Sequence, residues 1–178
     1  LLSQTKRCSD ILRNLSKDQF KEDTFLSDTK IEELLNEIVR SFTEISEKKL
    51  SLLVEKNELN PQIERSLEIT YGLRNFIGNA SKFSESLIEI KLQTSQQKTQ
   101  IKICDDGPGF PSDIINKLGE PYIKSSVKLT NTKLGLGLGT FIGKTLLERN
   151  YGKVSFTNKP QSGAQIKIVW LNDDLRKF

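Results

Sequence analysis

The sequence predicts an α/β two-layer sandwich, in which a mixed sheet carries helices on one face and follows an N-terminal helical extension. Short stretches of alternating apolar and polar residues, typical of half-buried strands, recur through the second half of the chain. Stretches with apolar residues at helical spacing lie between them. Strands and helices mixed in this order favour a sheet covered by a helical layer.

The elements are expected in the following order. Heptad-like apolar positions from Leu1 to Leu15 predict the end of a long helix, and a polar connection with a strand near 25–29 follows. A helix over 62–84 is expected after Pro61. Strands 87–94 and 99–105 form a hairpin across 95–98. The other expected elements are helices over 31–46, 111–117 and 139–150 and strands over 49–55, 153–158 and 164–171.

Composition indicates one globular domain with a helical extension. The chain has 178 residues, of which 35% are apolar and 28% charged, with a net charge of +4. Its lysines are spread along the chain, which argues against a nucleic-acid partner. Two distant cysteines without a secretory signal favour a cytoplasmic setting. No apolar run is long enough to span a membrane, although a longer parent protein could be anchored in one.

Four short segments point to a nucleotide pocket. They are Asn75-Phe76-Ile77-Gly78-Asn79-Ala80, Asp105-Asp106-Gly107-Pro108-Gly109, Pro121-Tyr122-Ile123-Lys124 and Gly135-Leu136-Gly137-Leu138-Gly139. In a helix, Asn75 and Asn79 lie on the same face, and the amide oxygen of Asn79 suits Mg²⁺, which takes few protein ligands. Taken alone, the asparagine pair is also compatible with exposed polar residues of a helix, and the Asp105 segment with a plain turn.

The other segments supply further nucleotide contacts. Asp105 ends a strand beside Gly107 and Gly109. A carboxylate at this position can accept a hydrogen bond from the amine of adenine, and the glycines let the backbone approach a flat base. The glycine segment and Thr140 precede an apolar helical pattern, and free amides at a helix start favour phosphate. Gly143-Lys144-Thr145 resembles a Walker A ending, but the glycine spacing fails, so Lys144 is interpreted as a helix-surface residue.

The polar stretch 117–133 is expected to be a loop, either a mobile lid over the nucleotide or a disordered segment. Lys82 and Phe83, which follow Asn79 on the same helix, are expected to face the pocket, although Phe83 would serve equally well as a core residue. Cys104 is expected to be a buried strand residue.

Together the four segments resemble the catalytic and ATP-binding domain of sensor histidine kinases, within the superfamily that includes gyrase and the Hsp90 chaperones. The resemblance implies that residues 1–18 end a dimerisation helix and that 19–178 form the catalytic domain. It implies ATP and Mg²⁺ as cofactors, a response regulator as partner, and a homodimer formed through upstream helices. The implied ATP-binding residues are Asn75, Asn79, Lys82, Phe83, Asp105, Gly107, Gly109, Tyr122, Ile123, Lys124, Gly135, Leu136, Gly137, Leu138, Gly139 and Thr140, with Asn79 as the metal ligand.

The resemblance also has departures. Ala164 stands where many relatives have a threonine that supports adenine recognition. The chain contains no histidine and no methionine, so we expect a piece of a longer protein whose acceptor histidine lies upstream. The resemblance implies a parent protein in the bacterial inner membrane. Asn75 replaces the glutamate that activates water in the hydrolase branch, and an amide is no general base, which favours phosphoryl transfer.

Residues 1–12 resemble a helix of the RegB/PrrB-type redox-responding kinases, which makes Cys8 a redox candidate, although a buried apolar position explains it as well. Two rival functions remain open. One is an anti-sigma-type serine kinase, and the other is a degenerate module that binds a nucleotide or a partner without turnover.

Overall fold

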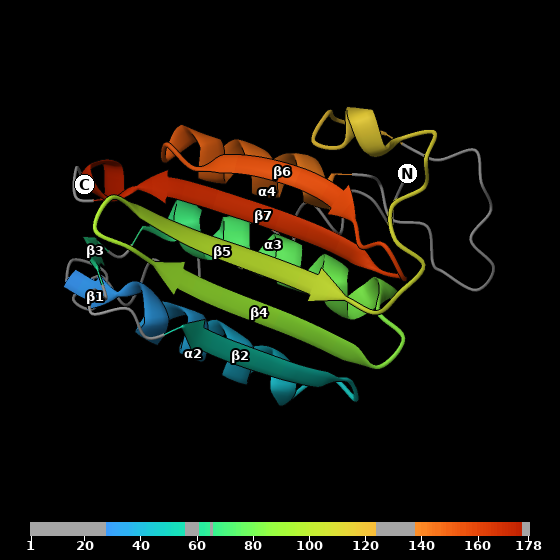
Figure 1. Ribbon diagram of the computed structural model, residues 1–178, viewed down its shortest axis with the longest axis horizontal. Coiled ribbons are helices and arrows are strands. Elements are labelled where there is room, and N and C mark those ends of the chain that lie inside the picture. Colours follow the sequence, from blue (N-terminus) through green and yellow to red (C-terminus); the bar gives the residue numbers. More distant parts are fainter. Residues whose placement is uncertain (1–27, 56–60, 65, 124–137, 176–178) are drawn as a thin grey trace, which may run out of the picture.

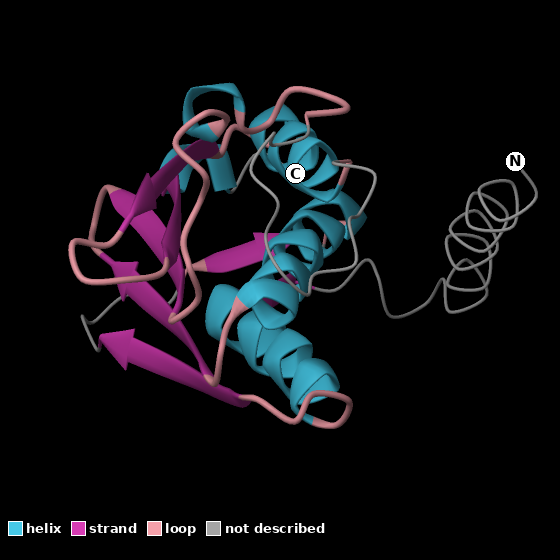
Figure 2. Ribbon diagram, turned by 90° about the vertical axis from the view of Figure 1, so that its right-hand side faces the viewer, coloured by secondary structure: helices cyan, strands magenta, loops and turns pink. Residues whose placement is uncertain are grey.

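The computed structural model describes residues 28–55, 61–64, 66–123 and 138–175. A five-stranded sheet carries helices α2 (Ile31–Thr43), α3 (Leu67–Phe83) and α4 (Gly139–Arg149) on one face (Figures 1 and 2). This arrangement confirms the predicted two-layer sandwich. The predicted helix before Leu15 lies outside the described residues.

The sheet is mixed in direction. Its spatial order is β2 (Lys49–Glu55), β4 (Leu87–Thr94), β5 (Lys98–Asp105), β7 (Ala164–Leu171) and β6 (Lys153–Asn158). β2 and β4 run parallel, and every other neighbouring pair is antiparallel. The bounds of β2, β4, β6 and β7 agree with the predicted ranges, and β5 begins one residue early.

Alternating side chains divide the sheet into two faces. In β4, Ile88, Ile90 and Leu92 are fully buried against the helices, whereas the residues between them point to the outer face. On the helical side, α2 buries a stripe of isoleucine and leucine that includes Leu34 and Ile38 and belongs to the same core. The core therefore lies between the sheet and the helical layer, and removal of this apolar surface from water drives the two layers together.

The predicted helix over 62–84 is wrong at its start. Residues Gln62–Glu64 form strand β3, which pairs with β1 (Asp28–Lys30) in a small antiparallel sheet. Ile63 is buried in the core as part of this strand. The helix begins after Ser66, whose hydroxyl accepts the N–H of Ile69 at 3.3 Å. A serine N-cap satisfies one of the unpaired donors of the first turn and fixes the boundary there.

Smaller differences occur at other element ends. Helix α2 stops at Thr43 rather than 46, and the predicted helix over 111–117 is a turn at Pro111 followed by a 3₁₀ helix, Ile115–Lys117. A short helix that was not predicted, α5 (Asn172–Leu175), ends the described chain. The side chain of Asn172 donates to the carbonyls of Ser95 and Gln96, so α5 is held by the β4–β5 hairpin rather than by its own sequence.

Candidate functional site

Close packing of two helices sets the geometry of the site. Along α3, Gly72 faces Leu147, Phe76 faces Gly143, and Asn79 faces Gly139 and Thr140 of α4. A side chain at Gly72 or Gly143 would lie within 3 Å of these partners. The two glycines therefore let the helices approach closely, and the order of contacts shows that they run antiparallel. This register places Asn79 beside the first turn of α4.

Asn79 contacts the start of α4 directly. Its Nδ2 donates to Oγ1 of Thr140 at 3.3 Å, and a Cβ on Gly139 would lie 3.2 Å from its Oδ1. The amide nitrogen of Asn79 thus donates to Thr140, and its amide oxygen is left as an acceptor. This oxygen lies beside Gly139, which has no side chain to crowd it. The predicted residues Asn79, Gly139 and Thr140 lie together.

Asn75 lies one turn before Asn79 and is also half-buried. Its Nδ2 donates to the carbonyl of Tyr71 at 2.8 Å, so its amide is bonded to its own helix. At the other end of α3, the ammonium of Lys82 lies 4.9 Å from the centre of the Phe83 ring. Lys82 is exposed and also borders a shallow groove beside the end of α2.

The second motif forms a turn at the end of β5. Asp105 is buried, and its Oδ1 accepts backbone N–H groups from Gly107 at 2.9 Å and from Ala164 at 3.1 Å. Both bonds go to one oxygen. Among the described residues no donor reaches Oδ2, so this oxygen is available to a ligand amine. Ala164 supports the site through its backbone, although it lacks the hydroxyl of a threonine.

The Asp105 turn packs directly on the end of α3. A Cβ on Gly107 would lie 2.2 Å from the carbonyl oxygen of Phe83, so no larger residue fits there without a shift. Gly109 has a φ of 80° and lies against Asn158. Two contacts, Asn79 with Thr140 and Phe83 with Gly107, therefore bring three of the predicted segments to the same end of the helical layer.

A carboxylate that sequence reasoning missed fixes this junction. Asp106 accepts backbone N–H groups from Glu85, Ser86 and Leu87 and the hydroxyl of Ser86 at 2.6–3.0 Å. Partial burial alone would raise the pKa of Asp106, but the hydrogen bonds from Ser86, Leu87 and Glu85 outweigh it and hold the pKa well below its usual range. Asp106 thus ties the β5 turn to the connection between α3 and β4.

Asp106→Asn is expected to lower the free energy of unfolding at neutral pH by about 1–2 kcal/mol, because an amide replaces a carboxylate that accepts several N–H groups. The loss stays in this range because solvent screens the partly exposed charge. The folded pKa is depressed, so this stabilisation is present above the unfolded pKa of about 3.9 and is lost as the pH falls towards the folded pKa. Urea unfolding of both proteins at pH 7 and at the lowest pH where both fold should show the difference shrinking. A constant difference would contradict the role of the charge.

Two further residues outside the predicted set hold the turn. The side chain of Asn158 accepts the N–H of Phe110 at 2.7 Å and donates to its carbonyl at 2.9 Å, and the hydroxyl of Ser162 donates to the carbonyl of Gly107 at 2.8 Å. Both residues come from the β6–β7 hairpin. Their partners are about fifty residues away in sequence, and no local sequence pattern predicts such contacts.

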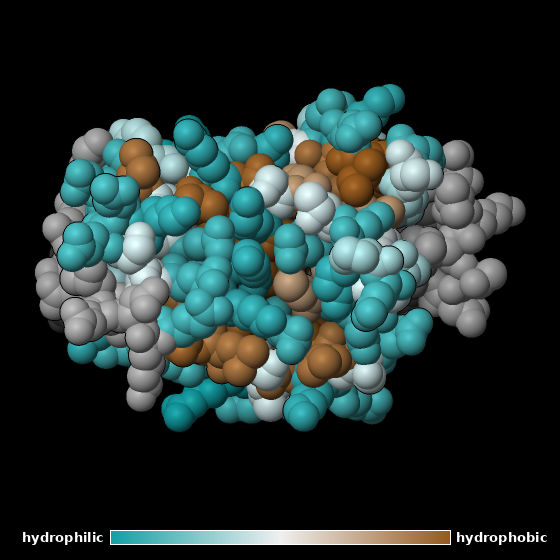
Figure 3. All heavy atoms as spheres, viewed as in Figure 1, coloured by the Kyte–Doolittle hydropathy of each residue, from teal (hydrophilic) through white to brown (hydrophobic). Residues whose placement is uncertain are grey.

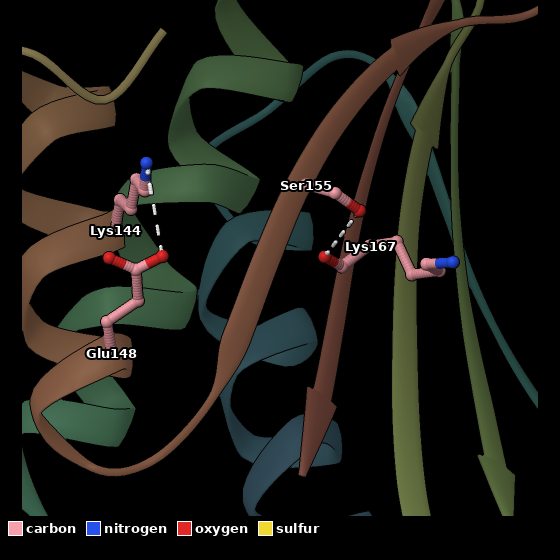
Figure 4. A network of polar contacts seen from close by, with 4 residues as sticks. All are labelled: Lys144, Glu148, Ser155 and Lys167. Atoms are coloured by element: carbon pink, nitrogen blue, oxygen red, sulfur yellow. Dashed lines mark hydrogen bonds and ion pairs between the residues drawn. The ribbon is translucent and has the colours of Figure 1, made fainter.

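Other predicted residues are placed as follows. Leu138 is the N-cap of α4, Tyr122 is exposed with a φ of 61°, and Ile123 is half-buried. Lys144 forms an ion pair with Glu148 at 3.9 Å on the surface of α4, which agrees with its interpretation as a helix-surface residue (Figure 4). The predicted residues Cys8, Lys124, Gly135, Leu136 and Gly137 lie outside the described residues.

Cys104 is buried in β5, as predicted, although it lies on the outer side of the sheet, with its Sγ 3.7 Å from Oε1 of Gln165. Burial raises the pKa of the Cys104 thiol, and this effect outweighs the positive charges of Lys159 and Lys91, which lower the pKa. A thiol with a raised pKa is a poor nucleophile, so Cys104 is a structural residue.

The site fits one magnesium ion in its donor chemistry. Mg²⁺ keeps several waters and usually takes one or two protein oxygens together with substrate phosphates. Oδ1 of Asn79, to which no described residue donates, is such an oxygen, and Gly139 has no side chain to fill the space next to it. In the described part of the chain, no group of three or more His, Cys, Asp or Glu side chains could hold a metal without a substrate.

Known proteins of one family resemble this chain. Residues 64–174 match the family of histidine kinase-, DNA gyrase B-, and HSP90-like ATPases. The sensor histidine kinase RegB of Cereibacter sphaeroides is 32% identical over 97% of this chain and 41% of its own length. The sensor protein KdpD of Clostridium acetobutylicum is 31% identical over 78% of this chain and 16% of its own length. The chain therefore spans about two fifths or less of these relatives.

Solved structures show the same fold. The mycobacterial sensor histidine kinase MprB has a TM-score of 0.70 and 19% identity, covering 82% of this chain and 97% of that one. Full-length ShkA in complex with AMPPNP has a TM-score of 0.67 and 21% identity, covering 82% of this chain and 31% of that one. The chain thus belongs to the histidine kinase-, DNA gyrase B- and HSP90-like ATPase family, and it is an ATP-binding catalytic domain of the sensor histidine kinase type.

Proposed function

We propose that this domain binds Mg-ATP at the junction of α3, the β5 turn and the first turn of α4, and transfers its γ-phosphoryl group to a histidine on another segment. The observation that carries the proposal is the contact between Asn79 and Thr140, which joins a candidate metal ligand to a helix start suited to phosphate. Full-length ShkA, a structural relative, is known in complex with AMPPNP, an ATP analogue, and this supports the same use here.

Each part of the junction has a separate task. Oδ2 of Asp105 accepts a hydrogen bond from the exocyclic amine of adenine, while Oδ1 keeps its hydrogen bonds from the N–H groups of Gly107 and Ala164. The first N–H groups of α4 have no partner within the helix and carry the positive end of its dipole, so they bind phosphate oxygens. In this proposal the base lies at the Asp105 turn, which packs on Phe83, and the phosphates lie at the first turn of α4, beside Asn79.

A magnesium ion held by Oδ1 of Asn79 would neutralise charge that builds up on the phosphates during transfer. The bond to Thr140 keeps the Asn79 amide in one orientation, so that its oxygen and not its nitrogen faces the ion. Lys82 lies at the same end of α3, where its ammonium can approach a phosphate.

Transfer is favoured over hydrolysis by Asn75. Its Nδ2 is bonded to Tyr71, and its amide cannot take a proton from water at neutral pH. Phosphoryl transfer depends mainly on positioning and charge neutralisation, with a nucleophile that can come from elsewhere. Because the chain contains no histidine, the acceptor belongs to a different segment. We propose that the phosphoryl group then passes to a response regulator.

The parent protein is proposed to be a homodimer that pairs through helices including residues 1–18 and that is anchored in the bacterial inner membrane. Within the described part of the chain, no helix has the length and apolarity needed to cross a bilayer. Cys8 is proposed as a redox-sensitive residue of the dimer. Oxidant should then link two chains through Cys8, and a Cys8→Ala protein that still forms the linked dimer would refute this.

The transfer itself can be tested by mixing the chain with a histidine-bearing helical segment and ATP labelled at the γ-phosphate. We expect an acid-labile, alkali-stable label on the segment, as phosphohistidine requires. An acid-stable label on serine would instead support the anti-sigma-type serine kinase. Nucleotide binding without any label, also with segments from several kinases, would support the module without turnover.

A further inference from the structure

A row of lysines crosses the outer face of the sheet, on the side opposite the helices. Lys91 of β4 lies directly opposite Lys102 of β5, and Lys102 lies directly opposite Lys167 of β7. Neighbouring strands are about 4.8 Å apart, so the three Cα atoms lie within roughly 10 Å of one another. Figure 4 shows Lys167 pointing away from Ser155 of β6 and towards β5.

The row is part of a wider basic surface. The outward positions of the five strands carry lysines at 49, 91, 98, 102, 153 and 167, against glutamates at 55 and 89. Figure 3, which views this face, shows hydrophilic side chains across its middle. Among the described residues, none of the three lysines of the row is in an ion pair, whereas Lys144 on the helical side pairs with Glu148.

This alignment works against folding. Like charges directly opposite each other on neighbouring strands destabilise a sheet, and the row contains two such pairs. Nothing in the fold requires lysine at these positions, because the side chains point away from the core. A repeated unfavourable choice of this kind is explained if the row binds a negatively charged surface.

Apolar residues on the same face indicate which surface it is. Leu53 lies opposite Lys91 and is 47% exposed, and Leu171 lies opposite Lys98 and is 58% exposed. The outward positions of the five strands hold no arginine and no aromatic residue. Bidentate binding of carboxylates and stacking on bases use those residue types, whereas lysines flanked by leucines suit a lipid interface.

We propose that the outer sheet face docks on a bilayer surface rich in anionic lipid, with the lysine row on the headgroup phosphates and the two leucines at the acyl boundary. Each lysine near such a surface strengthens binding about fivefold, so the row alone gives weak, reversible contact. The docking face lies opposite the helical layer, and the α3–α4 junction therefore stays accessible in the docked state (Figure 2).

The test is sedimentation of the whole chain with vesicles of phosphatidylglycerol and phosphatidylcholine, and with vesicles of phosphatidylcholine alone. We expect binding only to the anionic vesicles, weakened by salt. Replacing Lys91, Lys102 and Lys167 together by glutamine should lower the partition coefficient about 100-fold. Because this variant loses two like-charge pairs, its thermal unfolding temperature should not fall, which separates loss of binding from loss of folding.

The matched control also removes three positive charges, but from the helices: Arg40→Gln, Lys144→Gln and Arg149→Gln. An equal loss of vesicle binding in this control would overturn the proposal, since net charge alone would then explain the effect. Tighter binding to duplex DNA or to poly-glutamate than to the vesicles, or no vesicle binding at low salt, would also overturn it. None of these measurements needs ATP, so the outcome is independent of the proposed kinase activity.

Discussion

Asn79→Ala is expected to lower the affinity for an ATP analogue about 100-fold in the presence of magnesium and to abolish the difference that magnesium makes. The substitution removes the amide oxygen that we assign to the ion and also the donor that bonds Thr140. Calorimetric titration with a non-hydrolysable ATP analogue, with and without magnesium, measures both effects. Affinity that remains magnesium-dependent and unchanged would refute the ligand role.

Two further variants separate the ligand from its support. Thr140→Val keeps Asn79 but removes the acceptor that orients it, so a smaller loss of about tenfold is expected. Asn36→Ala, on an exposed position of α2, is the matched control and should bind the nucleotide as the wild type does. Thermal unfolding of all three should show that the losses do not arise from unfolding.

The strands were predicted more closely than the helix ends, and the reason lies in their periodicity. In β4 and β7 the residues alternate strictly between core and outer face, so the pattern fixes both the strand and its limits. Gln62–Glu64 is different because three residues with one central isoleucine fit a helix or a strand equally well. Its partner β1, more than thirty residues away, decides the outcome.

The residues of the candidate site were likewise predicted only in part. The Asn79, Asp105 and Gly139 segments were found because their residue types and spacing are themselves informative. Asp106, Asn158 and Ser162 were not, since what matters in each is a distant backbone group that it bonds. Asp106 stands beside Asp105 in the sequence, yet the two carboxylates face different elements. A local pattern can suggest ligand chemistry, but it cannot show which side chains hold the ligand-binding residues in place.

Gly163→Ala is expected to destabilise the protein by about 2–4 kcal/mol and to weaken ATP binding as well. Gly163 has a φ of +97°, and a Cβ there would lie 1.9 Å from the backbone oxygen of Asp105. The backbone must therefore move, and the neighbouring N–H of Ala164, which bonds Oδ1 of Asp105, moves with it. The stability loss is measured by urea unfolding, and the binding loss by titration with the ATP analogue.

Gly78→Ala provides the control at another glycine. Gly78 lies inside α3, and among the described residues a Cβ there would meet only the ring of Phe42 at 3.6 Å, an ordinary contact. Alanine is the better helix former by about 1 kcal/mol, so this variant should be as stable as the wild type or more so. If Gly163→Ala unfolded at the same urea concentration as Gly78→Ala, the close contact between Gly163 and Asp105 would not exist in solution. The adenine-binding role that we propose for Asp105 would then lack the support of β7.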